Sequence, residues 1–81
     1  MPAQSSPYAK NAVLVAVGTT IRRVRRARHI SQERLALETE IDRSYLGAIE
    51  RGEQNAGIMH LWRICSALDV AMSEVLDQAG L

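Results

Sequence analysis

Apolar residues recur every three or four positions in two separate parts of this chain, which is the spacing of one face of an α-helix. The residues that follow this spacing are Leu14, Val17, Ile21 and Val24 in the first part, and Ile58, Leu61, Ile64 and Leu68 in the second. Each set forms one stripe along a helix, and such a stripe must be buried against another surface. No segment shows the strict alternation of a half-buried strand. The sequence therefore predicts an all-α fold.

Capping residues divide the chain into five predicted helices. A side-chain oxygen at a helix start can accept a hydrogen bond from an otherwise unpaired backbone N–H, and glycine favours the left-handed turn after a helix end. The predicted caps are Ser6 or Asn11, Ser31, Asp42 and Ser73, and the residue predicted to end the third helix is Gly52. The helices then cover residues 7 or 12 to about 28, 32 to about 39, 43 to about 51, 58 to 68, and 74 onward. Five helices with short links predict a compact bundle.

The length and composition fit one small domain. Of the 81 residues, 47% are hydrophobic and none is Phe, so we expect a core of Leu, Ile, Val and Ala. Residues 1–10, which contain both prolines, are predicted to be a flexible N-terminal arm. Residues 11–81 are predicted to form the folded domain, with dimerisation helices at its C-terminal end.

Cysteine and histidine usage indicates no metal or cofactor. The single cysteine, Cys65, excludes an intramolecular disulfide, which fits a reducing compartment. His29 and His60 lack metal-ligand spacing with Cys65, and no nucleophile–base set is present, so we expect no metal, cofactor, small-molecule ligand or enzymatic activity. No apolar run approaches the roughly 20 residues that span a bilayer, and the N-terminus lacks a signal-peptide pattern. These features predict a cytoplasmic protein with no membrane partner.

Charge is distributed unevenly along the chain. Residues 1–32 contain six basic and no acidic side chains, whereas residues 33–81 contain four basic and nine acidic ones. A one-sided basic region indicates a polyanionic partner, but a solvated arginine-rich helix with acidic neighbours explains the charges equally well. Such a helix could also lie on a membrane surface, although its apolar stripe lacks the Phe, Trp and Lys that would favour this. Charge alone leaves these alternatives open.

The most informative stretch is residues 31–52, where two short predicted helices joined by Glu40 and Ile41 form a helix-turn-helix. Three segments occur in order around it: residues 18–22 (GTTIR), 31–36 (SQERLA) and 44–52 (SYLGAIERG). With Leu61, Ile64, Ala67, Leu68 and Val70, they resemble the Cro/repressor (Xre-type) helix-turn-helix family over about residues 17–76. The length is similar to that of the controller proteins of restriction-modification systems.

The resemblance implies a lambda-repressor-like fold and a sequence-specific regulator of transcription, for instance a repressor, that binds double-stranded DNA. Members of this family usually bind inverted-repeat operators as homodimers, with half-sites one helical turn apart, about 34 Å. We therefore expect the helix at residues 43–51 to lie in the major groove. An alternative hypothesis is an antitoxin-like protein-interaction module that also binds DNA.

Base contacts are expected from the predicted recognition helix, at Arg43, Ser44, Gly47 and Ala48. Arg43 can donate two hydrogen bonds to guanine O6 and N7, which discriminates by roughly 1–3 kcal/mol, or it can contact phosphate alone. The small side chains at residues 47 and 48 would allow close approach, and Ala48 could meet a thymine methyl group. Tolerance of a destabilising glycine also explains Gly47.

Phosphate contacts are expected from a second set of side chains, which are Arg22, Gln32, Tyr45, Arg51, Gln54 and Asn55. At the start of the second helix, the Gln32 amide and the free backbone N–H groups can bind a phosphate together. In the resembled family this glutamine and the loop after the recognition helix contact the DNA backbone. Two alternatives remain: Tyr45 can instead fill the gap between the second and third helices, and Asn55 can simply form a turn.

The resemblance also implies a structural ion pair between Arg25 and Glu50. The chain departs from the family pattern at Glu40 and His29, where glycine is common, and at residues 56–57, where Pro-Ser often begins the fourth helix. Because a left-handed backbone conformation is costly for a residue with a Cβ atom, we expect it to be strained at Glu40 or absent there.

The dimer surface is expected outside the first three helices. Trp62 lies off the stripe of Leu61, Ile64 and Leu68, and an exposed tryptophan suits an interface anchor. Packing beneath the N-terminal arm is the alternative for this side chain. The residues expected at the dimer interface are Trp62, Met72, Val75 and Leu76.

Overall fold

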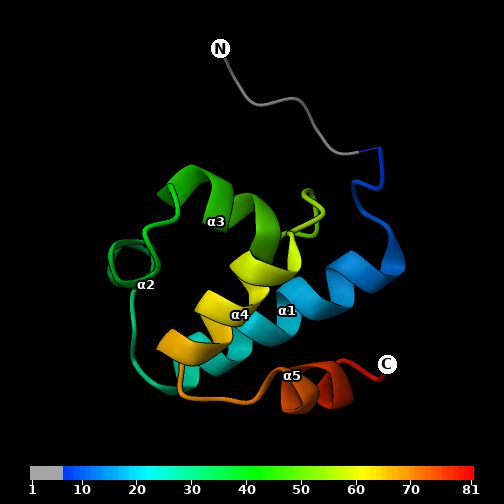
Figure 1. Ribbon diagram of the computed structural model, residues 1–81. Helices are drawn as coiled ribbons and strands as arrows, with labels where there is room; N and C mark the ends of the chain where they lie inside the picture. The colour runs from blue at the N-terminus through cyan, green and yellow to red at the C-terminus, as the bar shows by residue number, and fades with distance from the viewer. Residues whose placement is uncertain (1–6) are drawn as a thin grey trace.

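The computed structural model of this chain describes residues 7–81, and within this range it contains five α-helices and no strand. The helices are α1 (Ala12–Ala27), α2 (Gln32–Thr39), α3 (Arg43–Glu50), α4 (Ile58–Ala67) and α5 (Met72–Gln78). Figure 1 shows α1 and α4 in the middle, with α2 and α3 on one side and α5 on the other. The predicted all-α bundle of five helices is confirmed.

Side-chain caps begin the first three helices. Asn11 Oδ1 accepts a hydrogen bond from the Val13 N–H at 2.9 Å, so α1 begins at the second of its two predicted starts. The first of those starts, Ser6, lies outside the described residues. Ser31 and Asp42 cap α2 and α3 as predicted, because each side chain accepts a hydrogen bond from the backbone N–H of the third residue of its helix.

The predicted cap at Ser73 is wrong. Helix α5 begins two residues earlier than predicted, at Met72, with Ala71 at the cap position and no side-chain capping bond. Val75 is completely buried, so its burial against the core, rather than a capping bond, positions this helix.

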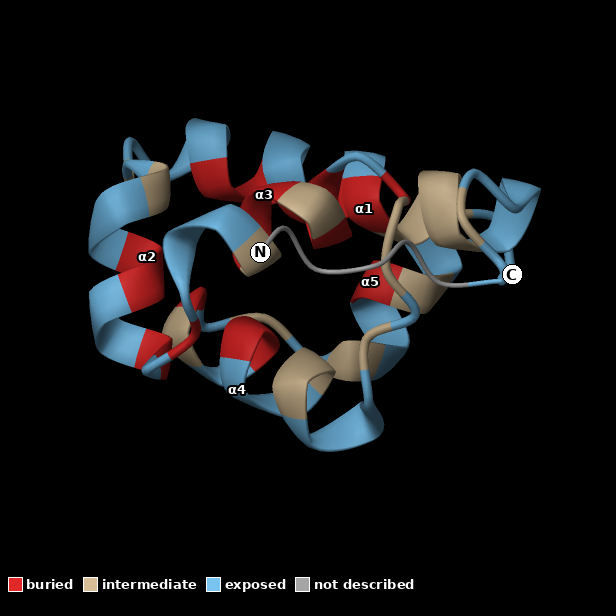
Figure 2. Ribbon diagram, turned by 90° about the horizontal axis from the view of Figure 1, so that it is seen from above, coloured by how far each residue is buried: buried red, intermediate tan, exposed pale blue. Residues whose placement is uncertain are grey.

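The core contains residues from all five helices. Seven side chains are almost completely buried: Ile21, Leu35, Leu46, Ile64, Cys65, Leu68 and Val75. Figure 2 shows the buried residues on the inward sides of the helices and the exposed ones outside. Burying one aliphatic side chain of this size stabilises a fold by about 1.5–3 kcal/mol. Ile58 was predicted to join this core but is 72% exposed, because the first residue of α4 projects beyond the surface that covers the rest of the stripe.

The turns after α1 and α2 keep left-handed conformations without glycine. Glu40 has φ 58° and His29 has φ 56°, so the conformation is present at Glu40 rather than absent. In each turn the next residue donates a backbone hydrogen bond back into the helix, from Ile41 to Ala36 and from Ile30 to Arg25. These hydrogen bonds close the turn after α2 in a backbone geometry that the Cβ atom of residue 40 disfavours.

Residues 7–10 are more ordered than the predicted arm. They form a turn in which Asn11 N–H donates to the Tyr8 carbonyl at 2.8 Å, and Lys10 N–H donates to the Gly52 carbonyl at 2.6 Å. The folded part of the chain therefore begins before residue 11. The rest of the predicted arm, residues 1–6, lies outside the described residues.

Helices α1 and α3 approach each other at Gly18. A Cβ atom on Gly18 would lie 2.6 Å from the Glu50 carbonyl oxygen and would also overlap the carbonyl oxygen of Ile49. Both clashes are with backbone, which cannot move without displacing α3. Residue 18 must therefore be glycine for α3 to rest directly on α1.

We predict opposite effects when the two helix-interior glycines are replaced by alanine. Gly18→Ala should destabilise the fold by about 1–3 kcal/mol because it pushes α3 away from α1. Gly47→Ala should stabilise it by about 0.5–1 kcal/mol, since the new methyl group meets only the flexible ends of Arg51 and Gln32. Urea unfolding of both variants measures the difference, and equal stability of the two would show that α1 and α3 are not in backbone contact.

Candidate nucleic-acid interface

Helices α2 and α3 form a helix-turn-helix whose outer side is open to solvent. Helix α3 packs on α1 and α2, and α2 also packs on α4, so both helices have fixed partners on their inner sides. The first turn of α3 begins at Arg43 and Ser44, and both of these residues are exposed. Figure 1 shows α3 along one edge of the molecule, away from α5.

A buried ion pair joins α1 to the end of α3. Arg25 Nε donates to Glu50 Oε2 at 2.7 Å, and Arg25 Nη2 donates to Glu50 Oε1 at 3.0 Å. The third donor, Arg25 Nη1, reaches the Ile30 carbonyl at 2.9 Å. The hydrogen bonds to Glu50 raise the pKa of Arg25. The predicted structural pair is thus formed, in the two-bond geometry that is strongest for arginine and a carboxylate.

Gln32 extends this pair toward the outer surface. Its Nε2 donates to Glu50 Oε1 at 3.0 Å, and its Oε1 accepts a hydrogen bond from Arg43 Nη1 at 3.2 Å. A continuous chain of hydrogen bonds therefore runs from Arg25 through Glu50 and Gln32 to Arg43. The Gln32 amide is oriented at both ends, because its nitrogen faces the carboxylate and its oxygen faces the guanidinium.

Gly47 does not lie on the free surface as predicted. It is buried, and a Cβ atom there would lie 3.1 Å from Arg51 Nη1 and 3.6 Å from Gln32 Nε2. The side chains of Arg51 and Gln32 cover this residue, so a direct base contact by Gly47 would require them to move away. The absence of a Cβ atom at Gly47 leaves room for the ends of these two polar side chains close to α3.

The other residues expected on α3 differ in exposure. Ser44 is exposed and Ala48 is half-buried, so both have surface available to a ligand. Tyr45 packs against the core, and the centroid of its ring lies 5.5 Å from that of His60 on α4. This packing favours a gap-filling role for Tyr45, but the contact of its ring is with α4 rather than between α2 and α3 as predicted.

The loop after α3 places Arg51 beside Glu53. Arg51 Nε and Nη2 both approach Glu53 Oε1, at 3.1 and 3.0 Å. The hydrogen bond from Arg51 lowers the pKa of Glu53. Farther along this loop, Gln54 is half-buried and Asn55 is exposed, next to the N-terminal turn that contains Tyr8.

Sequence reasoning missed Lys10 in this region. The Lys10 ammonium donates to the Arg51 carbonyl at 2.9 Å and lies 3.7 Å from Glu53 Oε2. Lys10 and Arg51 are 41 residues apart in the chain, and no periodic pattern or motif links them. Only the packing of the N-terminal turn on the loop after α3 reveals the contact.

The arginines of α1 point in several directions. Arg23 Nη2 donates to Gln78 Oε1 at 3.3 Å and Arg28 Nη2 to the Asp69 carbonyl at 3.4 Å, so these two face α5 and the turn before it. Glu38 pairs with Arg34 of its own helix, at 3.0 Å, rather than with an arginine of α1. Arg22 is exposed and remains a predicted phosphate contact.

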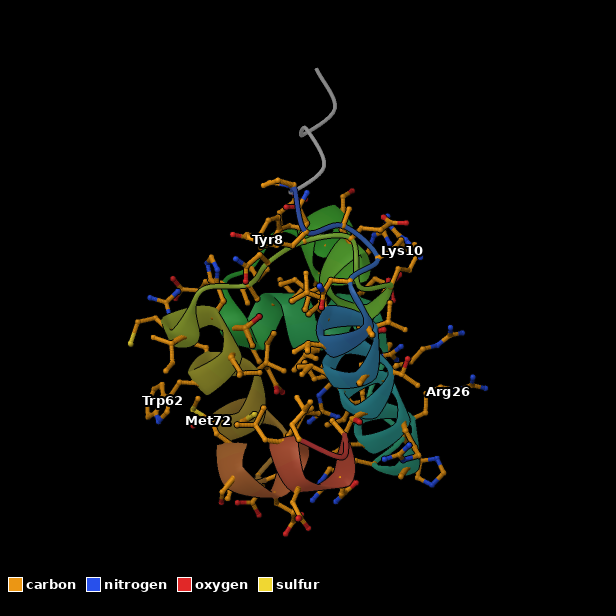
Figure 3. All side chains as sticks on the ribbon, turned by 90° about the vertical axis from the view of Figure 1, so that its right-hand side faces the viewer. Tyr8, Lys10, Arg26, Trp62 and Met72 are labelled. Atoms are coloured by element: carbon orange, nitrogen blue, oxygen red, sulfur yellow. The ribbon has the colours of Figure 1, made fainter. Side chains whose placement is uncertain are left out.

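The residues expected at a dimer interface are only partly available to a partner. Trp62 is 54% exposed, and Met72 and Leu76 are half-buried. Val75 has no exposed surface, so its assignment to the interface is corrected to the core. Figure 3 shows Trp62 and Met72 on the opposite side of the view from Lys10. Ile58 and Met59 are two further exposed apolar side chains on the same helix as Trp62. They were not predicted for this surface.

Cys65 and the two histidines have structural surroundings. Cys65 is buried in the core, where burial raises the pKa of its thiol. His60 packs on Tyr45, and His29 lies in the turn after α1. Among residues 7–81, no three His, Cys, Asp or Glu side chains are grouped as metal ligands. No helix within that range has the length and apolar character needed to cross a membrane.

A helix-turn-helix on a small helical bundle, with an arginine at the exposed start of its second helix and an amide side chain at the start of its first, defines a class of DNA-binding proteins. A family model described as "Helix-turn-helix" matches residues 21–75, which is more than half of the chain. The control protein C.BamHI of Bacillus amyloliquefaciens is 34% identical over 68 residues, which are 83% of this chain and 84% of that protein.

Two solved structures are similar over most of the chain. The restriction-modification controller protein C.AhdI from Aeromonas hydrophila has a TM-score of 0.77 at 39% identity, over 79% of this chain and 97% of that one. The master regulator for biofilm formation SinR, solved in complex with DNA, has a TM-score of 0.71 at 34% identity, over 75% of this chain and 98% of that one. The chain belongs to the helix-turn-helix family and is a DNA-binding transcriptional regulator of the controller or repressor type.

The buried ion pair generates a stability prediction. Glu50→Gln should destabilise the fold by about 3–5 kcal/mol, because it leaves the Arg25 guanidinium buried without a counter-charge. Glu38→Gln is a matched control that removes the same charge from an exposed arginine pair, and it should cost less than about 0.5 kcal/mol. Thermal unfolding compares them, and a Glu50→Gln melting temperature within a degree of the parent would show that the pair is unimportant.

Proposed function

We propose that this regulator binds an inverted-repeat DNA operator as a homodimer, with α3 of each protomer in the major groove. The observation that most supports this is the orientation of Arg43 at the exposed start of α3. Its guanidinium is held by Gln32, which is itself fixed by the buried Glu50. A preorganised arginine loses less side-chain freedom when it donates two hydrogen bonds to a guanine.

We propose separate roles for the exposed polar residues. Arg43 and Ser44 read base edges, with Ala48 close enough to the groove floor to meet a thymine methyl group. Gln32, Arg51, Gln54, Asn55 and Arg22 contact phosphates, which fixes the orientation of α3 without specifying sequence. Only the first group should therefore alter sequence preference when it is changed.

The dimer is proposed to form through the exposed side of α4. Ile58, Met59 and Trp62 present apolar surface there. The adjoining depression between α2 and α4 is lined by Glu38, Glu40 and Arg63 together with Trp62. In a two-fold dimer the same patch meets itself, so a surface with both charges beside an aromatic anchor can be self-complementary.

In vitro selection from random duplex DNA tests base reading. The parent chain should select an inverted repeat with a preferred guanine in each half-site. Arg43→Ala should lose preference at that position, by about 1–3 kcal/mol or roughly 5- to 150-fold. Arg22→Ala, the matched control, should weaken binding to all sequences alike and reduce the salt slope by about 0.9. Uniform weakening by Arg43→Ala would show that Arg43 does not read a base.

Sedimentation at micromolar concentration tests the dimer surface. Trp62→Ala should raise the dimer dissociation constant about 30-fold or more, as expected for an interface anchor worth at least about 2 kcal/mol. Leu37→Ala is the control, because Leu37 is 81% exposed but lines a different depression, beside Glu33 and Arg43. An unchanged dimer in Trp62→Ala would exclude Trp62 as an anchor.

A further inference from the structure

The N-terminal turn is attached to the loop that follows the recognition helix. Lys10 makes two bonds across this contact, from its backbone N–H to the Gly52 carbonyl at 2.6 Å and from its ammonium to the Arg51 carbonyl at 2.9 Å. Figure 3 shows Lys10 at the end of the molecule where α3 lies. A cation from the N-terminal turn is thereby held beside Arg51, a residue expected to contact phosphate.

Glu53 lies between these two cations. Its Oε1 accepts a hydrogen bond from Arg51 Nε and lies 3.0 Å from Arg51 Nη2, and its Oε2 lies 3.7 Å from the Lys10 ammonium. Each carboxylate oxygen thus faces a different cation. All three side chains are partly exposed, so solvent ions and larger anions can reach them.

A phosphodiester suits the same two cations. Like a carboxylate, it presents two anionic oxygens, which a guanidinium can contact through two N–H groups and an ammonium as a point charge. We propose that Lys10 and Arg51 form a binding site for one DNA backbone phosphate, which the Glu53 carboxylate occupies in the free protein. The proposal rests on the proposed DNA-binding function and adds Lys10 and Glu53 to its binding surface.

The Glu53 carboxylate should lower the affinity of the protein for DNA without altering its sequence preference. DNA must displace Glu53 before its phosphate reaches Lys10 and Arg51, and the displaced carboxylate then lies close to the phosphates. This cost is the same for every sequence, because phosphates are identical in all duplexes. The freed carboxylate also takes up a cation from solution, which offsets part of the counterion release that makes DNA binding salt-dependent.

Fluorescence anisotropy at several salt concentrations tests the proposal, with the full chain titrated onto a random-sequence duplex and onto the selected operator. Glu53→Gln should tighten binding to both duplexes by about two- to fivefold, the equivalent of one exposed ion pair. It should also steepen the salt slope by up to about 0.9. Glu38→Gln, which makes the same charge change and also frees an arginine on α2, should have a smaller effect on both.

Lys10→Gln shows whether the lysine belongs to the site. It should weaken binding more in the Glu53→Gln background than in the parent, since only there is Lys10 free of its competing anion. Equal effects of Glu53→Gln and Glu38→Gln, or no effect of Lys10→Gln in either background, would overturn the proposal and leave these contacts as a tie for the N-terminal turn. A parent chain that binds no DNA would overturn the proposed function as well, whereas specific binding with unresponsive variants would overturn this inference alone.

Discussion

The bidentate ion pair between Arg25 and Glu50 links the fold of this protein to its proposed DNA-binding surface. It joins α1 to the end of α3, and Glu50 also accepts the hydrogen bond that orients Gln32. Gln32 in turn holds the guanidinium of Arg43 at the exposed start of α3. One buried carboxylate thereby fixes both the position of α3 and the direction of its first arginine.

Glycine at two positions makes this arrangement possible. Gly18 lets the backbone of α3 rest on α1, where any Cβ atom would clash with the carbonyl oxygens of α3. Gly47 leaves room for the ends of the Gln32 and Arg51 side chains close to α3. The first glycine is needed for helix packing, whereas the second only gives space to flexible polar side chains, so the same residue type has different consequences at the two sites.

Much of the fold was predictable because its signals are local. The caps at Ser31 and Asp42 and the stripe through Ile21 and Val24 depend only on neighbours in the chain. Periodicity identifies the apolar face of a helix but not where the core ends, which is why Ile58 proved exposed and Val75 buried. The Arg25–Glu50 ion pair was predicted from the resemblance to a known family and not from a local pattern. The contacts of Lys10 with Gly52, Arg51 and Glu53 had no signal, because they join segments distant in sequence through a turn that no motif marks.

The central claim is that α3 reads DNA from the major groove in two symmetric half-sites. Methylation interference on the selected operator tests it directly, because N7 methylation of guanine blocks the major-groove edge that arginine contacts. We expect methylation to prevent binding at guanines in two half-sites separated by about one helical turn, some 34 Å. Interference confined to adenine N3 in the minor groove, or binding unaffected by methylation at any base, would contradict this account.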